Sequence, residues 1–192
     1  GYLSLTVDQI KNGFEIEHNS KLPLVINAEA VGPRKGLEAV NYGYDVKKWW
    51  HDSDGNAIDL SSGVLNAEQG DLFTVVIEIR KSDRVVMGDL LLSDLLPAGF
   101  EIEKSLISPP KVGDLLVDLE TGKKPDYTAH MDDRFIAHFE SRWYQGNHAV
   151  ISYVVRAAYS SEAQIGDAHV EHMYAPEIYG RSTVASAVVL EK

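Results

Sequence analysis

The sequence predicts an all-β chain that folds as one antiparallel β-sandwich, and two observations carry this prediction. Apolar and polar residues alternate with a period of two, the pattern of strands that have one buried and one solvated face. Short runs rich in Val, Ile, Leu, Tyr and Phe are separated by Gly, Asn, Asp and Ser, as in chains of strands joined by tight turns. The hydrophobic fraction of 44% excludes an intrinsically disordered chain.

The alternation is clearest in a strand expected over residues 73–79, where four apolar side chains share one face and Thr74 and Glu78 point to the solvated one. No long segment keeps a convincing helical stripe. Residues 89–96 form so short an apolar run that a strand and a helical turn are both open. Further strands with alternating patterns are expected at 3–8, 14–17, 24–31, 135–139 and 151–157.

Turn-forming residues separate these strands and mark one long inserted connection. Residues 104–133 carry the pair Pro109-Pro110 with a further proline and two glycines, and so long a connection in a β domain usually has a packing or functional role. No linker or change of composition splits the chain, so we expect a single domain over residues 1–192. The turn signals stand at Asn12-Gly13, Asp54-Gly55-Asn56, Gln69-Gly70-Asp71, Pro97-Ala98-Gly99 and Gly146-Asn147.

Charge and composition exclude several classes of protein. The formal net charge is −11, and basic residues form no cluster larger than a pair, which argues against a nucleic-acid interface and against attraction to anionic lipid. The chain has no Cys, so disulfides and thiolate chemistry are excluded. No apolar run approaches the roughly 20 residues of a membrane helix. The opening at Gly1 shows neither a signal peptide nor an initiator Met, and we expect a module cut from a larger extracytoplasmic protein.

Catalytic motifs are absent from the sequence. It contains no Gly-x-Ser-x-Gly elbow, no Ser-x-x-Lys, no phosphate-binding loop and no dinucleotide glycine fingerprint. The pair Asp132-Asp133 could act as two catalytic carboxylates, but a turn in which an Asp pairs with Arg134 is the favoured interpretation. We therefore expect a protein that is not an enzyme and that needs no cofactor.

Two segments resemble metal sites weakly. Residues 52–59 are rich in Asp, Asn and Gly, but Ala57 occupies the sixth position where a calcium loop of the EF-hand type needs Gly, which favours a hairpin tip. His169 and His172 are three residues apart, and a strand points such a pair to opposite faces. We expect no metal at either segment.

Adjacent aromatic residues are the remaining candidates for binding. In the pair Trp49-Trp50, alternation sends one ring to the core and the other to solvent. Trp143 is a third tryptophan, and a carbohydrate-binding module that stacks sugars on the three rings is one alternative. An adhesin- or receptor-like β-sandwich with its own extracellular partner is another.

Four segments in a fixed order carry a resemblance to the last macroglobulin-like domain of bacterial α2-macroglobulins. Residues 94–103 read DLLPAGFEIE and resemble the family signature DLLPAGFEIEN. Residues 132–137 read DDRFIA, similar to RDDRFVA, and residues 153–157 read YVVRA, similar to the start of YLVRAVTPG. Residues 170–177 read VEHMYAPE, similar to VEDMYRPE. The resemblance spans about residues 36 to 190.

The resemblance implies a fold and a function. The fold would be the C-terminal macroglobulin-like (MG10) domain, a fibronectin- or Ig-like β-sandwich. The parent protein would be a broad-spectrum inhibitor of foreign or host proteases, which traps a protease after the bait region is cleaved. The surface that packs against the thioester domain and shields it would comprise His172, Met173, Tyr174 and Pro176. His172 and Ala175 stand where the family has Asp and Arg.

The resemblance also implies where the protein works and with what. Its partners would be the thioester domain and the neighbouring macroglobulin-like domains of the same chain, and it would meet proteases only through the full-length protein. The location would be the periplasm. The resemblance covers parents with and without a Cys–Gln thioester, and includes a parent anchored to the inner membrane as a lipoprotein.

Overall fold

The computed structural model describes residues 38–60, 64–82, 85, 88–104, 122–140 and 148–191, with isolated positions before residue 38. The backbone divides into two units, Gly1–Pro33 and Arg34–Lys192, and all strands named below belong to the second unit. The strands expected before residue 32 fall largely outside the described residues, so the single domain over residues 1–192 stays a prediction. No helix among the described residues is long and apolar enough to cross a membrane.

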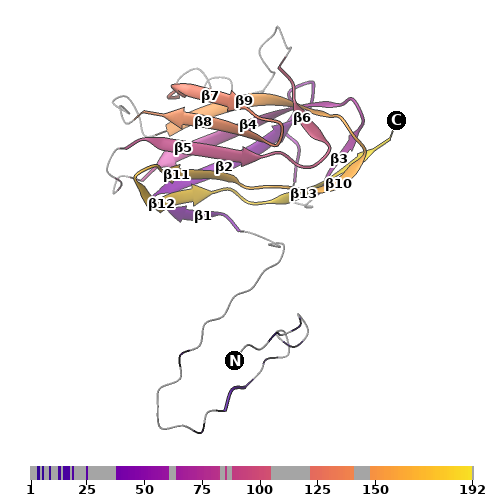
Figure 1. The fold of residues 1–192 in the computed structure, drawn as a ribbon. Coiled ribbons are helices and arrows are strands. Elements are labelled where there is room, and N and C mark those ends of the chain that lie inside the picture. The colour runs from indigo at the N-terminus through magenta and orange to yellow at the C-terminus, as the bar shows by residue number, and fades with distance from the viewer. Residues whose placement is uncertain are drawn as a thin grey trace. The chain divides into compact units, whose positions relative to one another are not determined.

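The described part of the second unit is all-β, as the sequence predicts, and its strands are labelled in Figure 1. The strands are β1 (Val40–Tyr42), β2 (Tyr44–His51), β3 (Val64–Glu68), β4 (Leu72–Lys81), β5 (Leu90–Leu95), β6 (Phe100–Ile102), β7 (Tyr127–His130), β8 (Arg134–Phe139), β9 (His148–Ala157), β10 (Ser161–Ile165), β11 (Ala168–His172), β12 (Ala175–Arg181) and β13 (Ala185–Leu190).

The strands form a sandwich of two large sheets with a smaller sheet at one end. Sheet A has six strands in the order β1-β12-β11-β5-β8-β7, and sheet B has four in the order β2-β4-β9-β6. Sheet C has three strands in the order β10-β13-β3. Figure 1 shows sheets A and B as two layers, with sheet C beside one end of them. All pairings are antiparallel except that of β3 with β13, which is parallel.

The predicted alternation is confirmed on the inner face of β4, where all four apolar side chains of residues 73–79 are buried in the core. The expectation of a wet outer face on this strand is wrong. Thr74, Val76 and Glu78 are all less than a tenth exposed. Trp49 on the neighbouring strand β2 packs against Val76, which accounts for part of this cover.

Two segments that the sequence left undecided are strands. Residues 90–95, within the run where a helical turn was also open, form β5 in the middle of sheet A. The expected connection at 104–133 contains β7, which pairs with β8 as the edge strand of sheet A. That connection is therefore shorter than predicted, and residues 105–121 within it lie outside the described part of the chain.

A buried ion pair joins sheet A to sheet B. Lys48 on β2 points into the sandwich, and its Nζ lies 2.6 Å from Oδ1 of Asp94 on β5. The two side chains are 4% and 0% exposed. The hydroxyl of Tyr153 on β9 donates a hydrogen bond of 2.6 Å to Oδ2 of the same Asp94. Both carboxylate oxygens of Asp94 are thus engaged by side chains from the opposite sheet.

The surroundings of the pair supply the remaining partners that a buried charge needs. Lys48 Nζ also donates to the backbone carbonyl of Gly166 at 3.3 Å and lies 5.7 Å from the centre of the Trp50 ring. The ring of Phe135 on β8 stacks on Tyr153 with centroids 4.4 Å apart. Burial, the negative charge of Asp94 and the hydrogen bond to it raise the pKa of Tyr153 well above its usual value, which keeps the hydroxyl a donor.

Sheets A and B also meet where β12 crosses the start of β2. Gly180 on β12 lies so close to the backbone carbonyl of Tyr44 that a methyl group at this position would overlap it. The Tyr44 side chain is 1% exposed, and this burial raises its pKa to about 12. The glycine is required here for close approach of the two strands.

Replacing Asp94 with Ala should lower the free energy of unfolding of the chain by roughly 3–5 kcal/mol, because the charge of Lys48 would stay buried without its partner. Urea unfolding at pH 7 measures the change. Asp133→Ala is the matched control, since Asp133 forms a solvent-exposed pair with Arg134 and should change the urea midpoint little. Equal effects of the two variants would contradict the structural role of the buried pair.

The stability of the chain should fall as the pH rises above 10. The pKa of Tyr44 is about 10 in an unfolded chain and about 12 in the fold, so its contribution is fully present below pH 10 and is lost between pH 10 and pH 12. In Tyr44→Phe this loss should be smaller by roughly 2 kcal/mol. Urea midpoints of the chain and the variant at pH 8 and pH 11.5 measure the difference, and parallel losses would contradict it.

Candidate functional site

The candidate site is the hairpin of β11 and β12, whose tip carries two exposed apolar side chains. Residues 168–172 pair with 175–181, and the two residues between them, Met173 and Tyr174, form the turn. Met173 is 44% exposed and Tyr174 is 79% exposed. Large apolar side chains side by side at a hairpin tip leave apolar surface in water, which is typical of a contact with another protein surface.

The hairpin is held firmly by its neighbour in sheet A. β11 pairs with β5 along its whole length, and Val170 on its inner face is fully buried. The backbone N–H of Met173 donates to the carbonyl of Asp89 at 2.9 Å, which fixes the first turn residue to the start of β5. The N–H of Tyr174 donates to Nδ1 of His172 at 3.2 Å. The exposed pair therefore sits on a rigid support.

The structure brings the four predicted site residues together on this hairpin. His172 ends β11, Met173 and Tyr174 form the turn, and Pro176 is exposed near the start of β12. Nothing in the chain alone tests what these residues contact, so their interdomain role stays a prediction. The hydrogen bond to His172 and the burial of Lys48 in an ion pair are not predicted from the sequence. The burial of Lys48 could have been inferred from the alternation along β2, because a period of two places this lysine on the same face as Val46 and Trp50.

The two weak metal candidates are accounted for by ordinary contacts. Asp52 Oδ1 accepts the backbone N–H of Asp54 and of Asn56, and Oδ2 accepts the Asn56 side chain. These hydrogen bonds, those from Asn56 foremost, lower the pKa of Asp52 and hold the turn after β2. His169 contacts Tyr179, with ring centroids 5.6 Å apart, and points away from His172. Within the described part of the chain, no group of three or more His, Asp or Glu side chains could hold a metal ion.

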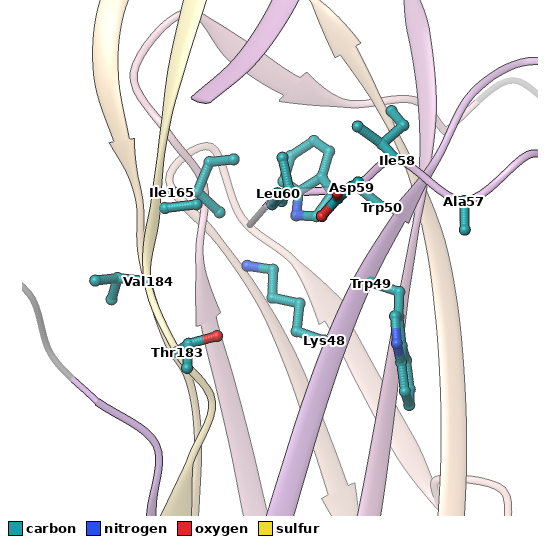
Figure 2. A pocket seen from close by; sticks show the side chains of 11 residues that line it. Lys48, Trp49, Trp50, Ala57, Ile58, Asp59, Leu60, Ile165, Thr183 and Val184 are labelled. Atoms are coloured by element: carbon teal, nitrogen blue, oxygen red, sulfur yellow. The ribbon is translucent and has the colours of Figure 1, made fainter. Parts of the chain in front are cut away.

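The remaining candidates do not assemble a site either. Asp133 forms an exposed ion pair with Arg134 at 2.7 Å, which confirms the turn interpretation of residues 132–134. Figure 2 shows Lys48 and Trp49 leaving β2 on opposite sides. Trp50 is 1% exposed in the core, so Trp49 and Trp50 cannot form one stacking platform for sugars. Trp143 lies outside the described residues.

A cleft of about 450 Å³ opens beside the buried ion pair, between β2 with the segment that follows it and the ends of β10 and β13. Its wall is mostly apolar and includes Ile58, Leu60, Ile165 and Val184. The one basic group on the wall is Lys48, whose ammonium is already bound to Asp94. The wall also carries the carboxylate of Asp59 and the hydroxyl of Thr183.

Comparison with known proteins agrees with this picture of the fold. The chain is 28% identical over 188 residues to an alpha-2-macroglobulin of Xylella fastidiosa (strain Temecula1 / ATCC 700964), covering 94% of this chain and 11% of that protein. It is 27% identical to alpha-2-macroglobulin of Escherichia coli (strain K12), covering 91% of this chain and 10% of that protein. The chain thus spans about a tenth of the length of these curated relatives.

The solved structures that match this chain are also bacterial alpha-2-macroglobulins. Native alpha-2-macroglobulin from Escherichia coli, spanning domain MG7 to the C-terminus, matches with a TM-score of 0.66 and 26% identity over 82% of this chain and 25% of that chain. Salmonella alpha-2-macroglobulin reacted with methylamine matches with a TM-score of 0.62 and 27% identity over 81% of this chain and 10% of that chain.

The model of one protein family matches residues 43–177, which is more than half of the chain. That family is described as the Bacterial Alpha-2-macroglobulin MG10 domain. The match covers β2, the buried ion pair and the hairpin tip together. The chain therefore belongs to the bacterial alpha-2-macroglobulin MG10 domain family.

Proposed function

We propose that this chain is the terminal structural and interaction domain of a broad-spectrum protease inhibitor of the bacterial α2-macroglobulin type. It packs against the thioester domain of the same protein and shields the thioester until bait cleavage triggers entrapment of the protease. The observation that carries the proposal is the exposed pair Met173 and Tyr174 at the tip of a rigid hairpin. The domain itself is not an enzyme.

The chemistry of a thioester supports this use of the pair. A thioester hydrolyses when water reaches its carbonyl carbon, so a protein that stores one must exclude water from it. A methionine thioether adapts its shape to a neighbouring surface, and a tyrosine ring covers a large area with few rotatable bonds. Solved relatives include a tyrosine-to-glycine mutant of Salmonella alpha-2-macroglobulin, which matches this chain with a TM-score of 0.64 and 28% identity.

The other partners and the location belong to the same proposal. Neighbouring macroglobulin-like domains contact the faces of the sandwich, and proteases are met only by the full-length inhibitor. The domain binds no nucleic acid, in line with the net charge of −11. The location in this proposal is the periplasm, as the family resemblance implies.

In a full-length parent with a Cys–Gln thioester, Tyr174→Gly should raise the rate of reaction with methylamine before any bait cleavage. Loss of the ring removes roughly 1–2 kcal/mol of apolar contact, which corresponds to roughly a tenfold rise in the open population. Release of the free thiol, followed with a thiol-reactive dye, measures the rate.

Tyr159→Gly is the matched control for this variant. Tyr159 is also an exposed tyrosine between two strands, 62% exposed, but it lies between β9 and β10. Its loss should leave the methylamine rate unchanged. If Tyr174→Gly reacts no faster than Tyr159→Gly, the shielding role of Tyr174 is wrong.

A further inference from the structure

The imidazole of His172 accepts a hydrogen bond from the exposed turn that carries Met173 and Tyr174. We propose that His172 is a positioning residue, whose neutral ring holds Met173 and Tyr174 in their presented conformation and releases them when it is protonated. The inference rests on the proposed function in taking this turn as the docking element. It adds a regulating group that acts through the turn and contacts no reacting atom.

The first observation is the hydrogen bond from the backbone N–H of Tyr174 to Nδ1 of His172, at 3.2 Å. A side-chain acceptor that binds the N–H two residues later reproduces the geometry of an Asx turn. The preceding N–H, that of Met173, is held by the carbonyl of Asp89. The two successive amides of the turn are thus both bound, that of Met173 by the Asp89 carbonyl and that of Tyr174 by the His172 ring.

The second observation is the space that Gly88 leaves for the ring. Gly88 precedes β5, and a methyl group there would overlap Nε2, Cε1 and Cδ2 of His172. The edge of the ring opposite Tyr174 therefore packs against the bare backbone of Gly88. The imidazole is held from both sides, by a hydrogen bond on Nδ1 and by close packing around Nε2.

Protonation removes the acceptor on which the turn depends. The N–H of Tyr174 needs a lone pair on Nδ1, and an imidazolium carries hydrogen on both nitrogens. Among the described residues, the charged ones nearest His172 along β11 and on its two paired strands are Glu171, Asp89 just before β5, and Glu177 on β12. By strand alternation Glu171 points to the opposite face of the sheet. Protonation of the ring should therefore loosen the turn.

The test uses the exchange of the Tyr174 backbone amide with solvent, measured by NMR on the 192-residue chain and corrected for intrinsic rates. His172→Leu should raise this exchange roughly threefold to tenfold at pH 8, the range expected for the loss of one hydrogen bond. Gly88→Ala should do the same by displacing the ring. His172→Asn restores a short side-chain acceptor and should stay within about twofold of the parent chain.

The pH dependence of the Tyr174 amide exchange distinguishes the proposed role of His172 from a purely structural one, which would not depend on pH. Between pH 8 and pH 5 the corrected exchange should rise in the chain itself and stay constant in His172→Asn. His169→Leu removes a histidine from the same strand but outside the turn, and should leave the Tyr174 amide unchanged. The amides of Val170 and Leu92, inside the sheet, show that each variant is folded.

The inference is overturned if His172→Leu leaves the exchange of Tyr174 unchanged, or if His172→Asn loosens the turn as much as His172→Leu does. Methylamine reactivity of the full-length parent then separates this inference from the proposed function. If the amide responds to His172→Leu but Tyr174→Gly leaves methylamine reactivity unchanged, His172 positions the turn and the shielding proposal is wrong. If Tyr174→Gly raises reactivity while His172→Leu changes neither readout, shielding stands and the role of His172 is wrong.

Discussion

The buried ion pair between Lys48 and Asp94 is the contact on which the rest of this structure depends. It joins the two large sheets through the middle of an otherwise apolar core, and Tyr153 occupies the second carboxylate oxygen. A hydrophobic interface alone tolerates many alignments of two sheets, because apolar contact is not directional. A sliding of one sheet over the other would leave two charges unpaired in a medium of low dielectric, which disfavours every alignment but this one.

Strand β5 transmits this constraint to the exposed turn. Asp94 lies near one end of β5 and is fixed by the opposite sheet, while Gly88 and Asp89 precede its other end and support the turn. β11 pairs with β5 from Asp94 to Leu90, so the hairpin projects from a strand whose position the ion pair has set. An exposed docking element gains affinity when it is rigid before binding, because less conformational freedom is then lost in the complex.

The sequence predicts the fold well because the fold follows from alternation, which is a local property. The inward face of β4 is an example, since its four apolar residues need no knowledge of the partner sheet. The prediction of a solvated outer face on β4 was wrong because burial there depends on another strand. Trp49 on β2 packs against Val76 and helps to cover this face. The ion pair was also missed. Alternation places Lys48 and Asp94 each on an inward face, but the sequence does not show that β2 and β5 lie opposite each other.

The turn itself explains why a site of this kind is hard to derive from local patterns. Met173 and Tyr174 are neither glycine, proline nor asparagine, so no turn chemistry marks them, and only a family resemblance pointed there. The turn is instead held by a neighbour in sequence, His172, and by the backbone carbonyl of Asp89, which precedes β5. A carboxylate at this position would accept the same hydrogen bond across the whole physiological range of pH. An imidazole accepts this hydrogen bond only while it is neutral. With His172 in place of the Asp of the family, the shape of the turn depends on the protonation of the ring, whereas a carboxylate would keep it fixed.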